Sequence, residues 1–310
     1  MTDSEGEAVR LIQVGLGHFG RSWATLIRGG EGVNLVAIAD PSPEARAWAQ
    51  RSLSLPASCC FASLENALEH VAGDAVLVVT PPGTHASLTQ TALQAGRHVL
   101  VEKPLATTLP DAEDVVRTAA EAGRIVMVSQ NYRFRAGART LQQQIAAGAI
   151  GALVAIRLRF RRDTRTLFPP GDFRYQMRQP LLLDMAIHHL DLIRAISGQD
   201  IVRVAARSWP VPGSPYAHHP AAAALLTLSS GTVALYDADW AAHDTETPWD
   251  GEWELLGTTG QVRWPGSTAQ EIALRRGDAP VEAIPVAPLA AEDRAGVLAA
   301  FRRKRAPLTI

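Results

Sequence analysis

Short apolar runs alternate with helical patterns along the first 130 residues of the chain. Alternation of this kind is typical of right-handed β–α–β crossovers, which build a parallel sheet. The predicted strands are residues 11–16, 34–39, 74–80, 98–101 and 125–129, and the predicted helices are residues 18–29, 43–53, 63–69, 84–96 and 110–122.

A different pattern follows a further predicted helix at residues 136–147. Longer stretches with partial alternation of apolar and polar residues are separated by glycines, which indicates strands joined by hairpins. A second helix, Leu181 to Ile196, interrupts them. The predicted fold is therefore an α/β Rossmann dinucleotide-binding domain over residues 1–130, followed by an α+β domain over residues 131–310 with a mostly antiparallel sheet. The strands expected in this second domain are residues 152–160, 201–209, 222–229, 232–240, 251–256, 260–264, 270–276 and 281–286.

The first predicted strand leads directly into a Gly-x-Gly-x-x-Gly motif formed by Gly15, Gly17 and Gly20. In a dinucleotide-binding turn, the first glycine permits the tight turn and the second lets backbone N–H groups approach a pyrophosphate. The third lets the following helix pack closely on its strand. The anion then lies at a helix N-terminus, where unpaired N–H donors and the helix dipole favour it. We expect cofactor contacts from these glycines and from His18 and Phe19 between them.

Asp40 ends the second predicted strand, twenty residues beyond Gly20. A carboxylate at this position accepts hydrogen bonds from the adenosine ribose hydroxyls and repels a 2′-phosphate, so NAD is the expected cofactor. NADP remains possible if Arg46 or Arg10 compensates. The alternative is that Asp40 only caps the next helix through Pro41-Ser42-Pro43.

Composition narrows the class of protein. The chain has 310 residues, of which 47% are hydrophobic and 20% charged, and its formal net charge is −1. These values favour two domains and predict no broad charged surface for nucleic acid or an anionic membrane. There is no membrane-spanning apolar run and no secretory signal, and the adjacent Cys59 and Cys60 make a poor disulfide. We expect a cytoplasmic protein that acts on a small molecule and holds no metal.

Three further segments carry a specific resemblance. They are Thr80-Pro81-Pro82-Gly83-Thr84-His85 after the third strand, Glu102-Lys103-Pro104 after the fourth, and Asp184-x-x-x-His188 on the predicted helix. Together with the glycine motif, they resemble the family of glucose–fructose oxidoreductase, inositol dehydrogenase and their relatives, from residue 10 to about residue 290. The resemblance implies that a Rossmann domain is joined to an open-faced sheet and that hydride moves between NAD(P) and a sugar or polyol. An open sheet face tends to be covered by association, so we expect a homodimer or homotetramer.

Lys103 is the first candidate catalytic residue. At the C-terminal end of a strand, its ammonium can hydrogen-bond a substrate hydroxyl, and the resemblance assigns it an acid–base and cofactor-contacting role. The alternative is an ordinary surface lysine. Glu102 is expected to orient Lys103 or to contact the nicotinamide portion of the cofactor. The resemblance places Pro104 in a cis bond.

His188 and Asp184 are the other candidate catalytic and substrate-binding residues. They are four residues apart and share one helix face. Histidine is suited to take the proton of an alcohol while hydride leaves, and the resemblance gives His188 this role and Asp184 the binding of substrate hydroxyls. His189 is the competitor, expected to pack instead. Asp191 is expected to form a supporting salt bridge.

The remaining candidates line the expected site. By resemblance, Thr80, Pro81, Pro82 and His85 line the cofactor channel, although an ordinary turn with Thr84 as helix N-cap is the alternative. The segment 131–134, with Tyr132 as a substrate contact, would enter the cleft or simply pack between domains. Further polar and stacking contacts are expected from Arg162, Asp172, Tyr175 and Trp240.

Two departures from the family pattern change the expectations. Residues 177–183 replace a run of glycines that gives substrate close access in relatives, which leaves room for a modified sugar or glycoside. The chain ends at Ile310, where relatives continue through another helix that packs on the nucleotide domain, so we expect this helix to be missing.

The predicted function is an NAD(P)-dependent oxidoreductase that acts on a CH–OH group of a sugar, polyol or related cyclic hydroxy compound. One alternative is a non-catalytic dinucleotide-binding regulator, which need not keep Lys103, Asp184 and His188 together. Another is an enzyme that uses NAD for transient oxidation during elimination or hydrolysis.

Overall fold

The computed structural model describes residues 8–243 and 245–303, and these form two compact units. The first unit contains residues 8–130 together with residues 294–303, and the second contains residues 131–293 apart from residue 244. No helix in the described ranges is both long and apolar enough to cross a membrane.

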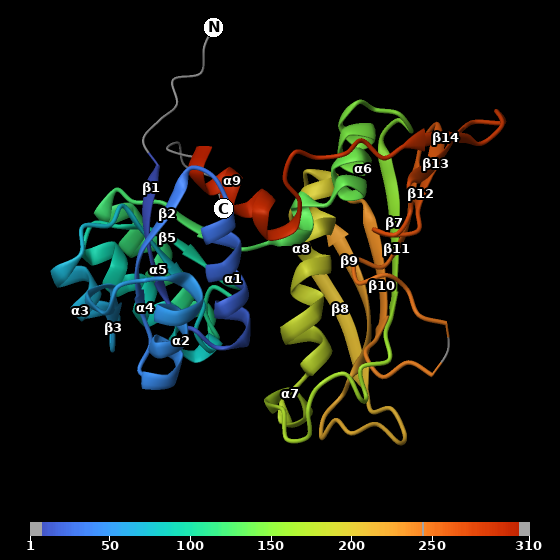
Figure 1. Cartoon of the computed structure of the whole chain (residues 1–310). Coiled ribbons are helices and arrows are strands. Elements are labelled where there is room, and N and C mark those ends of the chain that lie inside the picture. The colour runs from blue at the N-terminus through green and yellow to red at the C-terminus, as the bar shows by residue number, and fades with distance from the viewer. Residues whose placement is uncertain (1–7, 244, 304–310) are drawn as a thin grey trace, which may run out of the picture. The chain divides into compact units, whose positions relative to one another are not determined.

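The first unit is built on a parallel sheet with the strand order β3-β2-β1-β4-β5-β6 (Figure 1). Chain order reverses between β1 and β4, which is the position where doubly wound folds bind their ligands, at the C-terminal ends of the strands. The strands are nearly continuous runs of buried aliphatic residues because helices cover both faces. Its elements are β1 (Val9–Val14), α1 (His18–Gly29), β2 (Val33–Ala39), α2 (Pro43–Leu53), β3 (Cys60–Phe61), α3 (Leu64–His70), β4 (Ala75–Val78), α4 (His85–Gln94), β5 (His98–Val101), α5 (Leu109–Ala122) and β6 (Val126–Val128).

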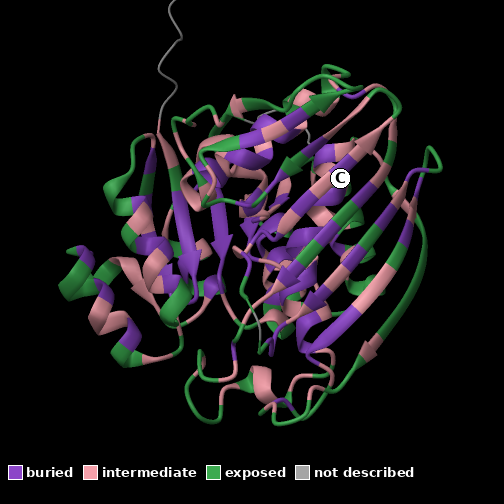
Figure 2. Ribbon diagram, turned by 90° about the vertical axis from the view of Figure 1, so that its right-hand side faces the viewer, coloured by how far each residue is buried: buried purple, intermediate pink, exposed green. Residues whose placement is uncertain are grey.

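The second unit is built on an eight-stranded sheet with the order β14-β13-β12-β11-β7-β10-β9-β8. All neighbours are antiparallel except β7 and β10, which run parallel. Burial alternates along these strands, as Figure 2 shows. Its elements are α6 (Ala136–Ala146), β7 (Leu153–Arg161), α7 (Phe173–Gln176), α8 (Ala186–Ser197), β8 (Ile201–Trp209), β9 (Ala221–Leu228), β10 (Val233–Asp239), β11 (Glu252–Gly257), β12 (Gly260–Trp264), β13 (Glu271–Arg276) and β14 (Glu282–Pro285).

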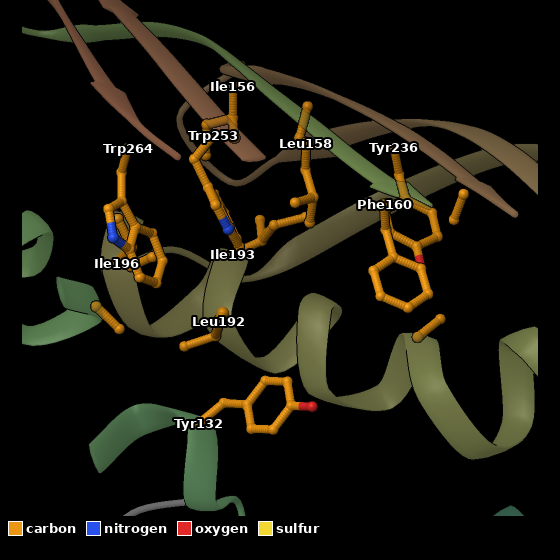
Figure 3. Close-up of a cluster of buried hydrophobic side chains, with 14 of the residues drawn as sticks. Tyr132, Ile156, Leu158, Phe160, Leu192, Ile193, Ile196, Tyr236, Trp253 and Trp264 are labelled. Atoms are coloured by element: carbon orange, nitrogen blue, oxygen red, sulfur yellow. The ribbon is translucent and has the colours of Figure 1, made fainter. Parts of the chain in front are cut away.

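The core of the second unit lies between one face of this sheet and α8. Figure 3 shows Trp253, Trp264 and Phe160 pointing from the strands toward α8, which contributes Leu192 and Ile193. The other face carries the alternate side chains of the same strands, and within the described part of this unit no helix covers it (Figures 1 and 2). The predicted fold class is thus confirmed: a Rossmann unit is followed by a unit with an open-faced, mostly antiparallel sheet.

The C-terminal helix corrects one expectation. Helix α9 (Asp293–Arg303) is present and belongs, from Arg294 onward, to the first unit rather than to a domain spanning residues 131–310. The Arg294 guanidinium lies 4.7 Å from the Phe19 ring centroid and donates a hydrogen bond to Ser22 at 2.8 Å. Helix α9 thus packs on the nucleotide-binding unit, and the expectation about a further helix beyond Ile310 stays a prediction.

Candidate active site

The glycine turn fits a bound pyrophosphate. Gly15 has φ +97°, and a Cβ atom there would clash with the Val79 carbonyl oxygen, while one at Gly20 would clash with the Gly15 carbonyl oxygen. A Cβ atom at Gly17 would meet no heavy atom within 4 Å, and Gly17 is the N-cap residue of α1. Two glycines are thus required by the fold itself, and the middle one leaves space at a helix N-terminus where an anion can approach.

Gln13 holds this turn, and the sequence analysis missed it. Its buried side-chain amide donates hydrogen bonds to the carbonyl oxygens of Gly15 (2.9 Å) and Gly20 (2.7 Å). A polar residue inside an otherwise apolar strand was the available signal, because a buried amide needs hydrogen-bond partners.

Asp40 connects the glycine turn to the end of β2. Its carboxylate accepts hydrogen bonds from the backbone N–H of Leu16 (2.7 Å) and of Ser42 (2.9 Å). Ser42, rather than Asp40, is the N-cap of α2, because its hydroxyl accepts from the Ala45 N–H. A carboxylate has about four acceptor positions, so two remain for ribose hydroxyls.

Arg46 and Arg10 are the two arginines expected to offset the repulsion between Asp40 and a 2′-phosphate. Arg46 donates to the backbone carbonyl of Asp40 at 2.7 Å and therefore lies beside it. Arg10 pairs with Asp74 at 2.7 Å, at the opposite end of β1. Its strand neighbour Asn34 lies six residues before Asp40, or about 20 Å along an extended chain. The expectation for Arg10 is therefore wrong.

His85 holds the turn after β4 in place through contacts with two backbone carbonyl groups. This side chain is buried, and its Nε2 and Nδ1 atoms lie 2.8 Å and 2.6 Å from the carbonyl oxygens of Thr80 and Pro104. His85 thus joins the turn at residues 80–84 to the segment after Lys103. Thr84 occupies the N-cap position of α4 but makes no capping hydrogen bond; its hydroxyl lies 2.8 Å from that of Thr80.

Glu102 fixes the backbone from which Lys103 projects. The buried Glu102 carboxylate accepts hydrogen bonds from the Trp23 indole N–H (2.8 Å) and from the backbone N–H of Lys103 (3.1 Å). Burial raises the pKa of Glu102. The Lys103–Pro104 peptide bond is cis, as the resemblance implied. Because β1, β4 and β5 run parallel, Lys103 after β5 and the glycine turn after β1 lie at the same edge of the sheet.

In the second unit, the His188 imidazole stacks on Tyr132. Their ring centroids are 4.3 Å apart with an interplanar angle of 17°. The Arg135 guanidinium lies 3.5 Å from the centroid of the same tyrosine ring. Both groups cannot occupy one ring face at these separations, so Tyr132 is held between His188 and Arg135. Burial raises the pKa of Tyr132 to about 12, which keeps its hydroxyl protonated near neutral pH.

Arg135 is anchored in turn by two carboxylates, which the sequence analysis did not find. It lies 3.2 Å from the fully buried carboxylate of Asp250 and 3.1 Å from that of Asp293. These partners are far away in the sequence, so no motif marks them. The ion pairs fix Arg135, and through Tyr132 they fix the plane against which His188 packs.

His189 is a core residue. Its Nδ1 lies 2.9 Å from the Tyr236 hydroxyl, and its Nε2 lies 2.9 Å from the Trp249 carbonyl oxygen. Complete burial lowers the pKa of His189 to about 4, so the ring is neutral, donates from Nε2 and accepts at Nδ1. Both ring nitrogens are used by the protein, as the packing interpretation expects.

Asp184 lies in a π-helical turn, Leu181–Met185, just before α8. Its carboxylate accepts a hydrogen bond from Arg174 at 2.7 Å, and Arg174 also pairs with Asp172 at 3.2 Å. No motif in the sequence marks Arg174. In the stretch of residues 177–183, where the resemblance implied glycines, Gln179 has φ +52°, a conformation that glycine adopts more readily.

Of the other residues considered for the site, Asp191 forms an ion pair, and Trp240 and Tyr175 pack within their own unit. Asp191 pairs with Arg133 at 2.5 Å, which confirms the predicted salt bridge. Trp240 is only 2% exposed and stacks on Tyr216, so its expected ligand contact is wrong. The Tyr175 hydroxyl donates to backbone carbonyls within its own unit, which also favours a packing role.

Each unit thus gathers its own part of the predicted site. In the first, hydrogen bonds connect the glycine turn to Asp40, helix α1 to Glu102, and the turn after β4 to Pro104. In the second, His188 contacts Tyr132, and Asp184 contacts Arg174.

Comparison with known proteins identifies the family. The model described as "Oxidoreductase family, NAD-binding Rossmann fold" matches residues 9–130, and the "GFO/IDH/MocA C-terminal domain" model matches residues 138–263. The chain belongs to this oxidoreductase family. Its first unit is the family's NAD-binding Rossmann fold.

Curated relatives match over most of the chain. It is 28% identical to the protein y4oX of Sinorhizobium fredii over 75% of this chain and 66% of that protein. It is 29% identical to D-apiose dehydrogenase of Paraburkholderia graminis over 88% of this chain and 72% of that protein. It is 27% identical to myo-inositol 2-dehydrogenase of Thermotoga maritima over 63% of this chain and 57% of that protein. The match to these relatives thus spans about two thirds of their length.

A solved structure supports the fold. An oxidoreductase from Agrobacterium radiobacter, in complex with NAD⁺, L-tartaric acid and magnesium, superposes with a TM-score of 0.83 at 22% identity. The superposition covers 95% of this chain and 86% of the other.

Proposed function

We propose that this protein is an NAD-dependent dehydrogenase that transfers hydride to or from a CH–OH carbon of a sugar, polyol or related cyclic hydroxy compound. The observation that carries the proposal is the hydrogen bond between Trp23 and Glu102. It connects the helix that begins at the glycine turn to the residue before Lys103. This hydrogen bond therefore connects Lys103, the candidate proton-carrying residue, to the helix that follows the dinucleotide-binding turn.

The cofactor would be held by the first unit. Backbone N–H groups at the start of α1 would bind the pyrophosphate beside Gly17, and the free acceptor positions of Asp40 would bind the ribose. Thr80, Pro81 and Pro82 would line the cofactor channel from the turn that His85 holds in place. When bound, NAD supplies the hydride acceptor. Asp40 favours NAD over NADP because its charge opposes a 2′-phosphate.

Lys103 and His188 would handle the proton of the substrate hydroxyl. The Lys103 ammonium donates a hydrogen bond to that oxygen, and the His188 imidazole takes the proton as hydride leaves the carbon. His188 suits this role better than His189, because both ring nitrogens of His189 are already engaged in the core. Stacking on Tyr132 holds the His188 ring in one plane.

The substrate class follows from polar groups and from relatives. Asp184 with Arg174 and Asp172 offers several hydrogen-bond donors and acceptors, which match a polyhydroxylated compound. Relatives are named for D-apiose and myo-inositol. We infer a sugar or polyol, and the replaced glycines at residues 177–183 leave room for a modified sugar.

The open face of the second sheet would be the interface between copies of this chain in a homodimer or homotetramer. Leu225 on β9 and Leu235 on β10 are cross-strand neighbours on this face, and they are 46% and 45% exposed. Beside them, Glu254 pairs with Arg157 at 2.6 Å and with Arg263 at 2.8 Å. An apolar patch bordered by charged pairs is typical of a surface that binds a second copy.

The test is NAD reduction against a panel of sugars, polyols and their keto forms, with the products identified. We expect net formation of NADH with at least one cyclic polyol or sugar. Conversion without net NADH would favour transient oxidation, and binding of NAD without any conversion would favour a regulator.

A further inference from the structure

A cavity of about 450 Å³ lies in the first unit, away from the candidate active site. It opens at the N-terminal ends of β1, β4 and β5, where Val9, Ala75 and His98 line it. The glycine turn and Lys103 follow the C-terminal ends of these strands, at the other edge of the sheet. Helix α9 completes the wall with Phe301 and Arg302.

The lining of this cavity carries a strong excess of positive charge. Four arginines line it, and Asp74 is the one carboxylate among the lining residues. Asp74 is held by Arg10, which donates to both of its oxygens at 3.2 Å and 2.7 Å, and this pairing lowers the pKa of Asp74. Asp74 also interacts electrostatically with Arg97, but within the described residues no carboxylate lies within ion-pair distance of the other three arginines. These three are Arg97, Arg124 and Arg302.

Backbone groups hold these guanidinium groups without neutralising them. Arg124 donates to the carbonyl oxygen of Gly96 at 2.6 Å, and Arg302 donates to that of Glu31 at 2.9 Å. Gly32 lies directly against the Arg302 guanidinium, where a Cβ atom would clash with it.

We propose that this cavity, which we call the arginine cavity, binds a small organic anion with at least two negative charges. Phosphate and carboxylate oxygens match the forked donors of guanidinium groups, and several such groups together favour multiply charged ligands. The volume lies within the range of small-molecule sites and exceeds what inorganic phosphate needs. The proposed ligands are phosphorylated or polycarboxylate compounds. This proposal is independent of the dehydrogenase activity.

Isothermal titration calorimetry of the full chain with inorganic pyrophosphate and, separately, citrate tests the proposal. The protein is first saturated with NAD so that the glycine turn cannot account for the pyrophosphate signal, and ionic strength is held constant. We expect saturable binding of at least one probe with a Kd below about 1 mM. Tighter binding of pyrophosphate would indicate a phosphorylated ligand, and tighter binding of citrate a polycarboxylate.

The decisive variant is Arg97→Gln combined with Arg124→Gln. We expect it to weaken binding at least about tenfold, because charge-assisted hydrogen bonds are lost, while NAD affinity stays unchanged. Arg117→Gln is the matched control, since Arg117 is an exposed arginine of α5 that pairs with Asp114 outside the cavity, and it should bind like wild type. If the double variant does not fold, Arg302→Gln replaces it with the same expectation. Equal affinity of the folded variants and wild type, or no saturable binding of either probe, would overturn the proposal.

Discussion

Trp23 donates its indole N–H to the carboxylate of Glu102 across 2.8 Å, and both side chains are buried. Seventy-nine positions separate them in sequence. Glu102 also accepts from the backbone N–H of Lys103, so one carboxylate ties the first helix of the Rossmann unit to the candidate catalytic lysine. The position of Lys103 relative to the glycine turn thus rests on this buried hydrogen-bonded group.

Substitutions at two positions of the glycine motif should affect different properties, one the stability of the fold and the other the affinity for NAD. We expect Gly15→Ala to lower the free energy of unfolding by about 2 kcal/mol or more, since it combines a positive φ with a backbone clash. Gly17→Ala should unfold like wild type but bind NAD at least about tenfold more weakly, because the methyl group occupies the open approach to the turn. Urea unfolding and a fluorescence titration of NAD measure both quantities. Wild-type NAD affinity in Gly17→Ala would argue against a pyrophosphate at this turn.

The proton-handling residues should affect turnover rather than cofactor affinity. Lys103→Ala and His188→Ala should each lower kcat by roughly a hundredfold or more and leave the NAD Kd within a few-fold of wild type. Steady-state kinetics with the substrate found in the panel, together with NAD titration, check this. His189→Gln is the control, and it should keep most of its kcat when it is folded. A large loss in His189→Gln with little loss in His188→Ala would mean that the histidine assignment is reversed.

Cofactor preference should depend on Asp40. We expect wild type to bind NAD more tightly than NADP, and Asp40→Ser to narrow the difference by removing the charge that opposes the 2′-phosphate. Arg46, which lies beside Asp40, is then available to attract that phosphate. Competitive titration of both cofactors measures the preference. Tighter binding of NADP than of NAD by wild type would contradict the assignment of NAD as the preferred cofactor.

His189 should make the stability of the protein depend on pH. Its pKa is about 4 in the folded protein and about 6.5 when unfolded, so between these values the unfolded chain binds more protons. Stability is therefore fully present above about pH 6.5 and falls as pH drops toward 4, by roughly 3 kcal/mol. Urea unfolding of wild type and His189→Gln at several pH values should show a shallower dependence in the variant. Parallel curves would show that His189 is not a buried neutral group.

The open sheet face should hold two copies together. Light scattering at micromolar concentration should show a dimer or a tetramer for wild type and a smaller species for Leu235→Glu, because a charge would be buried in the interface. Leu109→Glu, at an even more exposed leucine of α5 in the first unit (71% exposed), is the control and should not change the mass. A monomeric wild type would contradict the proposed oligomer.

Local patterns predicted the regular elements well because their causes are local. The glycine turn and the buried strands follow from conformational rules that act over a few residues. The first strand was predicted to reach residue 16 but ends at Val14, because Gly15 turns the chain away with φ +97°. Strand β3 and helix α7 were missed because two and four residues show no periodicity.

Features that depend on distant partners could not be predicted. Helix α9 belongs to the first unit through Arg294 and Phe19, which are far apart in sequence. The Arg135 pair with Asp250 and the Arg174 pair with Asp184 likewise arise only once the chain is folded. The motifs therefore predicted the candidate catalytic residues, whereas the residues that position them became visible only in the structure.

We propose that this protein moves hydride directly between a substrate carbon and the nicotinamide ring. The most direct test uses a substrate found in the panel, labelled with deuterium on the carbon that bears the reacting hydroxyl. The NADH formed is then analysed by mass spectrometry. We predict that the NADH carries the deuterium and that Lys103→Ala and His188→Ala form it far more slowly. Unlabelled NADH, or product formed with no labelled NADH at any time, would contradict direct hydride transfer.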